Sequence, residues 1–450
     1  MTVLEQIGEW LAVGDAPLPQ RVQQILTIHL LDTVGAWIAG RATEEGEKLA
    51  RLVASPGQAL PVFDGQPLDR IALAVATTRL TEIDDIHTPS CTTPGSVIVP
   101  TALVIASQMR QRSARAFSHA LLAGYEVMTR FGTAISGPRV LQRGIWPTYF
   151  AAPMCAAAVA ARLLGLGAGQ TADAIAIALT MTSGAPGRPT GASPRWLLLG
   201  LAARAGCAAA LSAAEGYAGD RTLLDADWMT RTHGIACDTG PLVSAAQGDG
   251  AVAALSLKPY CAAKQTLAAI EAFQNLLGQD ISPHDIVALR VSVPPAYAEM
   301  IGRRDAAAGR LARITSVAYM LAIAAHRPEE LDDVARADLS GDPQIAAFMS
   351  RVEVVPDQAL EHHYPERWPA RVEAELQNGR KETNFVLDAI GDPPRSHDFD
   401  SRAKFHRLAD PVIGRPASNE FAEACLAAAV QDDALATLCA KFTSQSAHLR

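Results

Sequence analysis

The sequence is poor in aromatic side chains and rich in small apolar ones. Phe, Trp and Tyr make up 5% of its 450 residues, whereas apolar residues make up 49% and alanine runs such as residues 151–161 recur. This composition favours tightly packed helices over sheets. A chain of this length and apolar content can bury a large core and should divide into two or three domains.

Clusters of positive charge are also missing. No run of Lys and Arg is longer than a pair, and the formal net charge is -8. Nucleic-acid surfaces need clustered Lys and Arg, so we expect no nucleic-acid partner. An anionic substrate must be bound by a local positive pocket, against the sign of the whole molecule.

Paired cysteines and long apolar runs are missing as well. The seven cysteines form no CxxC pair, which argues against a zinc site or a disulfide framework. The stretch 144–161 is apolar but contains Pro147 and Pro153, so it is a poor membrane span. The start, MTVLEQIGEWLAV, carries two glutamates and no basic residue, unlike a signal peptide. We therefore expect a cytoplasmic protein with no membrane partner and no metal.

Apolar residues recur at helical spacing through most of the chain, and almost nothing alternates with period two before Lys258. The pattern over 20–40 stops at Gly40, a common helix end. The other predicted helices cover 43–54, 67–81, 97–111, 114–134, 149–165, 171–183, 196–216, 263–277 and 311–325.

Short β-branched segments bounded by Pro, Gly or Asp follow Lys258 and predict strands. They cover 286–294, 352–357, 370–379 and 381–389, and Asn378-Gly379 predicts a hairpin between the last two. The sequence thus predicts a mainly α protein in three parts. A helical domain covers 1–257, a smaller α+β domain 258–394, and a helical tail 395–450 that rejoins the first domain.

The stretch LTEIDDIHTPSCTTPGSVIVP, residues 80–100, gathers Glu82, Asp84, Asp85 and His87 before a helix begins. A carboxylate can orient an imidazole and support its use as an acid or base. The alternative is a solvated turn in which Ser96 caps the next helix. Residue types alone do not decide between the two.

Two further polar segments lie in apolar surroundings. GRPTGASPRWLLLG, residues 187–200, places Arg188 and Arg195 before a long helix, where guanidinium groups could hold a carboxylate. LKPYCAAKQTLAAIEAF, residues 257–273, contains Lys258, Tyr260 and Lys264. Lys264 opposes the helix dipole on a first turn, which hints at a role other than helix stability; solvated lysines are the alternative.

Together these segments resemble the MmgE/PrpD family of 2-methylcitrate dehydratases, cis-aconitate decarboxylases and iminodisuccinate epimerases. LLDTVGAWIAG (30–40) is similar to its N-terminal helix signature, and EIDDIHTPSCTTPGSVIVP (82–100) to its Asp-rich loop. The other similar blocks are LLGLGAGQTADAIAIA (163–178), GLAARAGCAAALSAAEGYAG (200–219), LKPYCAAKQTLAAIEA (257–272) and GDPPRSHDFDSRAKF (391–405).

The resemblance implies a discontinuous helical domain, an α+β lid with the active site between them, and a homodimer. It implies chemistry without metal or organic cofactor, in which a base removes a proton beside a carboxylate and cationic groups hold the anion. Loss of hydroxide, loss of carbon dioxide, or return of the proton then gives a dehydratase, a decarboxylase or an epimerase.

The chain departs from the family pattern at several positions. Glu82 replaces an aspartate, Ile86 a threonine, and Arg195 a lysine. Thr93 and Trp146 stand where the family has histidines, and a histidine that often follows the KPY segment is also missing. These changes argue against 2-methylcitrate as the substrate and suggest a pocket more apolar than is usual for the family.

We therefore predict a lyase or isomerase that acts on a small carboxylic acid. Asp85 with His87 or Lys264 is the predicted proton-transfer pair, and Glu82 is a further catalytic candidate. The predicted substrate-binding residues are Arg195, Lys258, Asp84, Thr93, Trp146 and Tyr260. The alternative from another class is an inactive member of the family that binds or scaffolds.

Overall fold

Helices form most of the chain in a computed structural model, which describes residues 1–14, 16–53, 62–182, 194–244, 249–303, 306 and 309–447. The prediction of a mainly α protein is confirmed. The chain divides into two compact units: the first includes the described residues before Ser256 and those from Ser401 onward, and the second includes the described residues of Ser256–Asp400.

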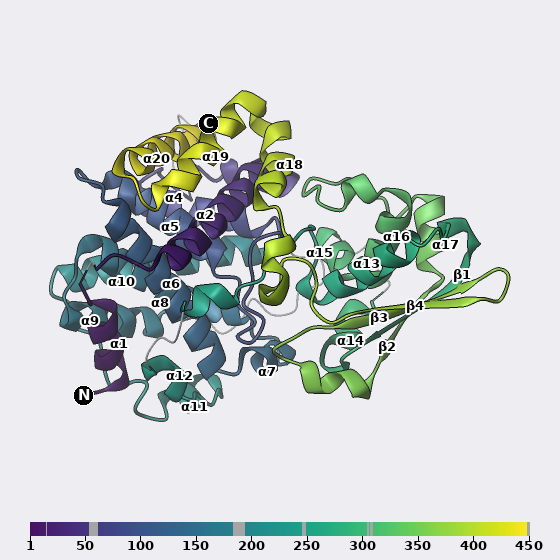
Figure 1. The fold of residues 1–450 in the computed structure, drawn as a ribbon. Helices are drawn as coiled ribbons and strands as arrows, with labels where there is room; N and C mark the ends of the chain where they lie inside the picture. Colours follow the sequence, from purple (N-terminus) through teal and green to yellow (C-terminus); the bar gives the residue numbers. More distant parts are fainter. Residues whose placement is uncertain are drawn as a thin grey trace. The chain divides into compact units, whose positions relative to one another are not determined.

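The first unit is helical throughout its described part (Figure 1). Its helices are α1 (Val3–Leu11), α2 (Gln20–Arg41), α3 (Glu44–Ala50), α4 (Pro67–Arg79), α5 (Gly95–Gln108), α6 (Ala114–Ala134), α7 (Gly137–Gln142), α8 (Pro147–Leu164), α9 (Ala168–Thr180), α10 (Pro194–Ala214), α11 (Trp228–His233), α12 (Gly240–Val243), α18 (Ser401–Ile413), α19 (Arg415–Ala428) and α20 (Asp432–Ala447).

Small residues let the central helices of this unit approach closely. The alanine-rich helix α8 packs against α6, α9 and α10. A Cβ added to Gly206 of α10 would lie 2.0 Å from the carbonyl oxygen of Pro153 in α8, so only glycine fits at this crossing. The small side chains that the composition provides therefore let α8 lie close to its neighbouring helices.

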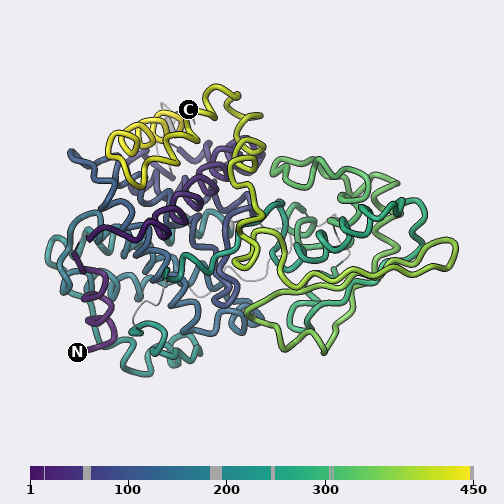
Figure 2. Tube along the Cα trace, viewed as in Figure 1, coloured from purple at the N-terminus to yellow at the C-terminus, as the bar shows by residue number. Residues whose placement is uncertain are grey.

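The C-terminal helices return to the N-terminal part of the chain. Helices α18 and α19 pack against α2, as the chain path in Figure 2 shows. Trp37 of α2 stacks on Phe442 of α20 with ring centroids 4.1 Å apart. Helix α18 thereby brings a lysine, Lys404, into the interior of the unit.

The second unit contains a four-stranded mixed sheet with strand order β2-β1-β3-β4. Strands β1 and β2 are parallel, and the other neighbouring pairs are antiparallel. The strands are β1 (Ile286–Val293), β2 (Val352–Pro356), β3 (Ala370–Leu376) and β4 (Lys381–Val386), and the helices are α13 (Lys264–Leu277), α14 (Pro295–Ile301), α15 (Arg310–Thr315), α16 (Val317–His326) and α17 (Pro343–Met349). Helix α13 packs on β3 and β4.

The predicted hairpin is confirmed, because β3 pairs with β4 and Gly379 has a φ of 79°. The single helix predicted over 311–325 is wrong. It is interrupted at Ser316, whose side chain accepts a hydrogen bond from the backbone N–H of Tyr319 and starts a second helix.

Two helices among the described residues are long and apolar enough to cross a membrane, judged by length and composition. They are Pro147–Leu164, of which 89% is buried, and Arg195–Ala214, of which 44% is buried. A core helix passes the same test, so these helices are weak evidence for a membrane span.

Candidate active site

The loop between α4 and α5 is buried although it is rich in polar residues. Glu82, Asp84, Asp85 and His87 are all less than a tenth exposed. Glu82 and Cys91 adopt left-handed backbone conformations, with φ of 57° and 54°. Such strain in non-glycine residues persists only where surrounding contacts fix it, and it clusters at functional sites. The solvated-turn alternative therefore does not describe this loop.

Asp85 is held by three donors from three helices. Its Oδ2 lies 2.9 Å from Nδ1 of His29 and accepts a 3.2 Å hydrogen bond from the hydroxyl of Tyr125. Its Oδ1 accepts a 2.8 Å hydrogen bond from the N–H of Gly95, the first residue of α5. Burial, and next the charge of Asp85, raise the pKa of Tyr125 well above its ordinary value, so this hydroxyl stays protonated and donates.

The contact with Asp85 fixes the state of the imidazole of His29. A carboxylate only accepts hydrogen bonds, so the proton between the two groups lies on Nδ1 of His29. Among the described residues, no hydrogen bond reaches the other ring nitrogen, Nε2. Neutral His29 thus has a lone pair on Nε2 and a carboxylate behind Nδ1, which is the arrangement of a general base.

Gly95 leaves no space for a side chain beside this carboxylate. A Cβ at this position would lie 2.8 Å from both carboxylate oxygens of Asp85 and 2.7 Å from Oγ1 of Thr33. The helix start at Gly95 also corrects the prediction for Ser96. Ser96 does not cap α5; its hydroxyl donates to the carbonyl oxygen of Thr93 instead.

A second carboxylate, Asp32 of α2, lies in the same interior and is paired with Lys404. The Nζ of Lys404 is 2.5 Å from Oδ1 of Asp32 and donates a 2.8 Å hydrogen bond to the carbonyl oxygen of Ile83. Burial raises the pKa of Asp32, although Lys404 acts in the opposite direction. Lys404 therefore joins helix α18 to both α2 and the loop. We call Asp85, His29, Tyr125, Gly95, Asp32 and Lys404 the Asp85 cluster.

Glu82 is surrounded by permanent positive charge. Its Oε1 accepts 3.1 Å hydrogen bonds from Arg195 and from the indole N–H of Trp196, and its Oε2 is 2.6 Å from Arg79. Arg79 also donates a 3.1 Å hydrogen bond to Asp84. Burial lowers the pKa of Arg79, but Asp84 and Glu82 outweigh it and the pKa is raised overall. We call Glu82, Arg79, Asp84, Arg195, Trp196 and Trp146 the Glu82 cluster.

Arg195 keeps one donor unused in this cluster. Its guanidinium lies over the ring of Trp146, 4.0 Å from the centroid, and its Nε is 3.4 Å from the hydroxyl of Tyr149. Its NH1 is buried and has no hydrogen-bond partner among the described residues. An unsatisfied buried guanidinium nitrogen is costly, and a substrate carboxylate could satisfy it. The other arginine of this predicted loop, Arg188, lies outside the described residues.

His87 does not contact Asp85 by a hydrogen bond. Its Nδ1 lies 2.8 Å from the hydroxyl of Ser90 and accepts a 3.3 Å hydrogen bond from the N–H of Ser90. Burial lowers the pKa of His87 to about 4, so this imidazole is neutral at pH 7. Thr93 makes a 3.2 Å hydrogen bond with the hydroxyl of Thr148.

The predicted residues of the second unit have local partners. The Nζ of Lys264 is 2.5 Å from Oδ1 of Asp392, which accounts for a cation on the first turn of α13. Tyr260 donates a 2.9 Å hydrogen bond to the side chain of Gln274. Lys258 is buried. The pairing of Asp85 with Lys264 stays a prediction.

The sequence reading missed His29, Asp32, Tyr125, Arg79 and Lys404. A signal existed for the first two, because His29 and Asp32 are polar residues one turn apart in the otherwise apolar helix pattern of 20–40. No group of three His, Cys, Asp or Glu side chains suited to a metal ion occurs in the part of the chain that the structure describes.

Comparisons with known proteins agree with the resemblance. The family model of the MmgE/PrpD N-terminal domain matches residues 5–233, and that of the C-terminal domain matches residues 260–428. A cis-aconitate decarboxylase of Aspergillus terreus is 28% identical over 239 residues, which cover 50% of this chain and 48% of the relative. The cis-aconitate decarboxylase-like protein oryM of Aspergillus oryzae is 33% identical over 153 residues, 32% of this chain and 31% of the relative. The matched region thus spans about half or less of each relative. Because the two family models together match most of its residues, this chain belongs to the MmgE/PrpD family.

Proposed function

We propose that this protein is a lyase or isomerase that transfers a proton at a carbon beside a carboxylate of a small carboxylic acid, without a cofactor. The observation that carries the proposal is the buried pair of His29 and Asp85, 2.9 Å apart, in which Nε2 of His29 has no partner among the described residues. Lyase chemistry on carboxylic acids is also consistent with the names of the two relatives.

In the proposed reaction His29, and not the predicted His87 or Lys264, is the partner of Asp85 in proton transfer. Nε2 of His29 accepts the proton from carbon, and the C–H electron pair moves onto the adjacent carboxylate. Asp85 stabilises the imidazolium that results, as a buried carboxylate does in a catalytic triad. The unused NH1 of Arg195 is the proposed donor to the substrate carboxylate, on which negative charge develops.

The fate of the anion decides the reaction class. Loss of hydroxide from the neighbouring carbon gives elimination. Delivery of a proton to the other face of the carbon, by solvent or by a donor other than His29, gives epimerisation. For decarboxylation the order reverses: the C–C bond to the departing carboxylate breaks first, and protonated His29 then supplies the proton to carbon.

Two features bear on the choice of substrate. Trp146 covers one face of Arg195, and Ile86 is buried beside Asp85 in the loop. Both support a substrate with fewer carboxylates than methylcitrate or with an added apolar group. The relatives make cis-aconitate the first compound to test. The homodimer and the cytoplasmic location stay predictions.

The test is a panel of carboxylic acids, beginning with cis-aconitate, incubated with the protein in deuterated water and followed by NMR. We expect deuterium exchange, elimination, decarboxylation or epimerisation of at least one acid, and none with His29→Gln. If no acid reacts but several bind, the inactive binding protein becomes the better account. If an acid reacts equally with His29→Gln, the proposed base is wrong.

A further inference from the structure

A large cavity lies in the first unit, where residues of α1, α2 and α6 line it. Its volume is about 680 Å³, within the range of small-molecule sites. Most of its wall is apolar and comes from α1, residues 18–22, α6, residues 243–244 and residues 249–250. The apolar wall residues include Trp10, Leu11, Leu18, Val22, Leu122 and Val243.

A smaller, more polar cavity of about 250 Å³ adjoins it. Both cavities are lined by Glu126, Arg130, Ser244 and Gly250, so these residues stand between them. The smaller cavity also reaches His87 of the loop. The pair of cavities therefore has an apolar end and a polar end.

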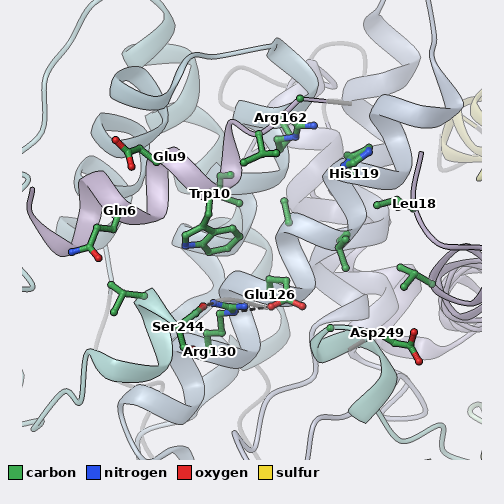
Figure 3. A pocket seen from close by; sticks show the side chains of 18 of the residues that line it. Gln6, Glu9, Trp10, Leu18, His119, Glu126, Arg130, Arg162, Ser244 and Asp249 are labelled. Carbon is green, nitrogen blue, oxygen red and sulfur yellow. Dashed lines mark hydrogen bonds and ion pairs between the residues drawn. The ribbon is translucent and has the colours of Figure 1, made fainter. Parts of the chain in front are cut away.

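Arg130 is held rigidly where the two cavities meet. Its Nε is 2.7 Å from Glu126, its NH1 donates a 2.5 Å hydrogen bond to the carbonyl oxygen of Ser244, and its guanidinium lies 5.0 Å from the ring centroid of Trp10. Figure 3 shows Arg130 and Glu126 together below Trp10, with His119 and Arg162 at the opposite end of the view. Among the described residues, no partner is found for NH2 of Arg130.

His87 offers a second donor at the polar end. Because the N–H of Ser90 donates to Nδ1 of His87, the neutral ring carries its proton on Nε2. No hydrogen bond reaches this Nε2 from the described residues. Two residues that line the smaller cavity, Arg130 and His87, thus each carry an N–H donor without a partner among the described residues, one on a charged group and one on a neutral group.

We propose that these joined cavities bind an amphiphilic monocarboxylate, with its carboxylate at Arg130 and His87 and its hydrocarbon part against Trp10 and the aliphatic wall. One carboxylate is favoured over two or three because Glu9, Glu126 and Asp249 also line the larger cavity and repel further negative charge. The apolar wall favours a hydrocarbon body over a second polar group. This site is separate from the His29–Asp85 pair and does not rest on the proposed reaction.

The test is calorimetric titration of the full chain with octanoate, with citrate and 1-octanol as comparisons. We expect saturable binding of one octanoate per chain, binding of octanol at least tenfold weaker, and no citrate binding at these cavities. Octanoate binding should persist in Asp85→Asn, which separates this site from the proposed reaction. No saturable octanoate binding, or tighter citrate binding that Asp85→Asn retains, overturns the proposal.

Two variants test the two ends of the site. Glu126→Gln with Arg130→Met removes the head-group donor without leaving a carboxylate alone, and Ala123→Phe fills the apolar cavity from α6. Each should weaken octanoate binding at least tenfold. Arg143→Met, which removes an exposed arginine bonded to the carbonyl oxygen of Gly234, is the matched control and should leave binding unchanged. Circular dichroism checks that each variant is folded, and unchanged octanoate binding by both folded cavity variants contradicts the site.

Discussion

Asp85 and Glu82, after which the two clusters are named, lie three residues apart on one loop. They differ in the groups that face each carboxylate. Glu82 and Asp84 face arginines, which stay charged at any pH at which the protein is folded. Asp85 faces an imidazole, which can accept and donate a proton, and a phenol, which stays protonated. Glu82, Asp84 and Asp85 are all buried, so the difference is not one of solvent access.

We propose different tasks for the two clusters. An arginine cannot serve as a base near neutral pH, so Arg79 and Arg195 can bind and orient but not abstract a proton. Histidine has its ordinary pKa near neutral pH and can accept or donate a proton there. In the proposed function, Asp85 and His29 therefore transfer the proton and Arg195 anchors the substrate.

The largest expected effect is on the Asp85 cluster. Asp85→Asn removes the acceptor that holds the proton on Nδ1 of His29 and stabilises the imidazolium, so we expect kcat to fall by roughly 10³-fold. Steady-state kinetics measures this fall in kcat, with the carboxylic acid that the deuterium-exchange panel identifies as a substrate. The control is Asp173→Asn, another ion-paired carboxylate of the first unit, which should keep kcat. An equal fall in both variants would show a general loss of folding.

The second prediction concerns the stability that Lys404 gives to the Asp85 cluster. Lys404→Met leaves Asp32 charged or forces it to bind a proton, and leaves the carbonyl oxygen of Ile83 without this donor. Loss of one partner of a buried pair costs about 4 kcal/mol, which urea unfolding measures. The double variant Asp32→Asn with Lys404→Met should recover part of the loss. The exposed pair of Lys48 and Glu44 is the control, and Lys48→Met should change stability little.

The third prediction concerns His87, whose buried imidazole is neutral at pH 7 and, unlike that of His29, is not paired with Asp85. Its pKa is about 4 in the folded protein against an ordinary 6.5, so the unfolded chain binds the proton first as pH falls. The stability that neutral His87 contributes is full above pH 6.5 and is lost as pH falls from 6.5 to 4. Between pH 7 and pH 5 the wild type should lose about 2 kcal/mol more unfolding free energy than His87→Gln. Equal losses in urea unfolding would contradict a buried neutral His87.

The smallest expected effect is on the Glu82 cluster. Arg195→Lys keeps the charge but loses the planar contact with Trp146 and the second nitrogen that reaches beyond Glu82. We expect KM to rise about tenfold with a smaller change in kcat, because an anchor acts on substrate and transition state alike. A large fall in kcat with unchanged KM would move Arg195 from anchoring to chemistry.

Local signals in the sequence predicted the elements well. The helix predicted over 114–134 has the same bounds as α6, and Asn378-Gly379 marked the hairpin, because helical periodicity and a left-handed turn are local properties. The split at Ser316 was missed since a capping serine inside an apolar run resembles an ordinary helix residue. The start of α5 was placed too late for the opposite reason, because Ser96 was taken as a cap and instead lies inside the helix.

The candidate site was predictable only in part. The loop of 80–100 stood out because its polar residues are consecutive in sequence. Two of the three partners of Asp85, His29 and Tyr125, lie 56 and 40 residues from it, and Lys404 lies 321 residues from Ile83. Such contacts depend on tertiary packing, and no spacing rule relates residues that far apart. The three-part domain division and the functional roles of the predicted residues remain predictions.

The most direct test of the central claim is the washing-in of solvent deuterium at the carbon beside the substrate carboxylate, measured by mass spectrometry. The wild type and His29→Gln are compared on the same acid, with Arg195→Lys as a variant of the other cluster. The account predicts that His29→Gln loses the exchange by roughly 10³-fold, while Arg195→Lys at saturating acid keeps most of it. Exchange at the wild-type rate in His29→Gln would contradict it.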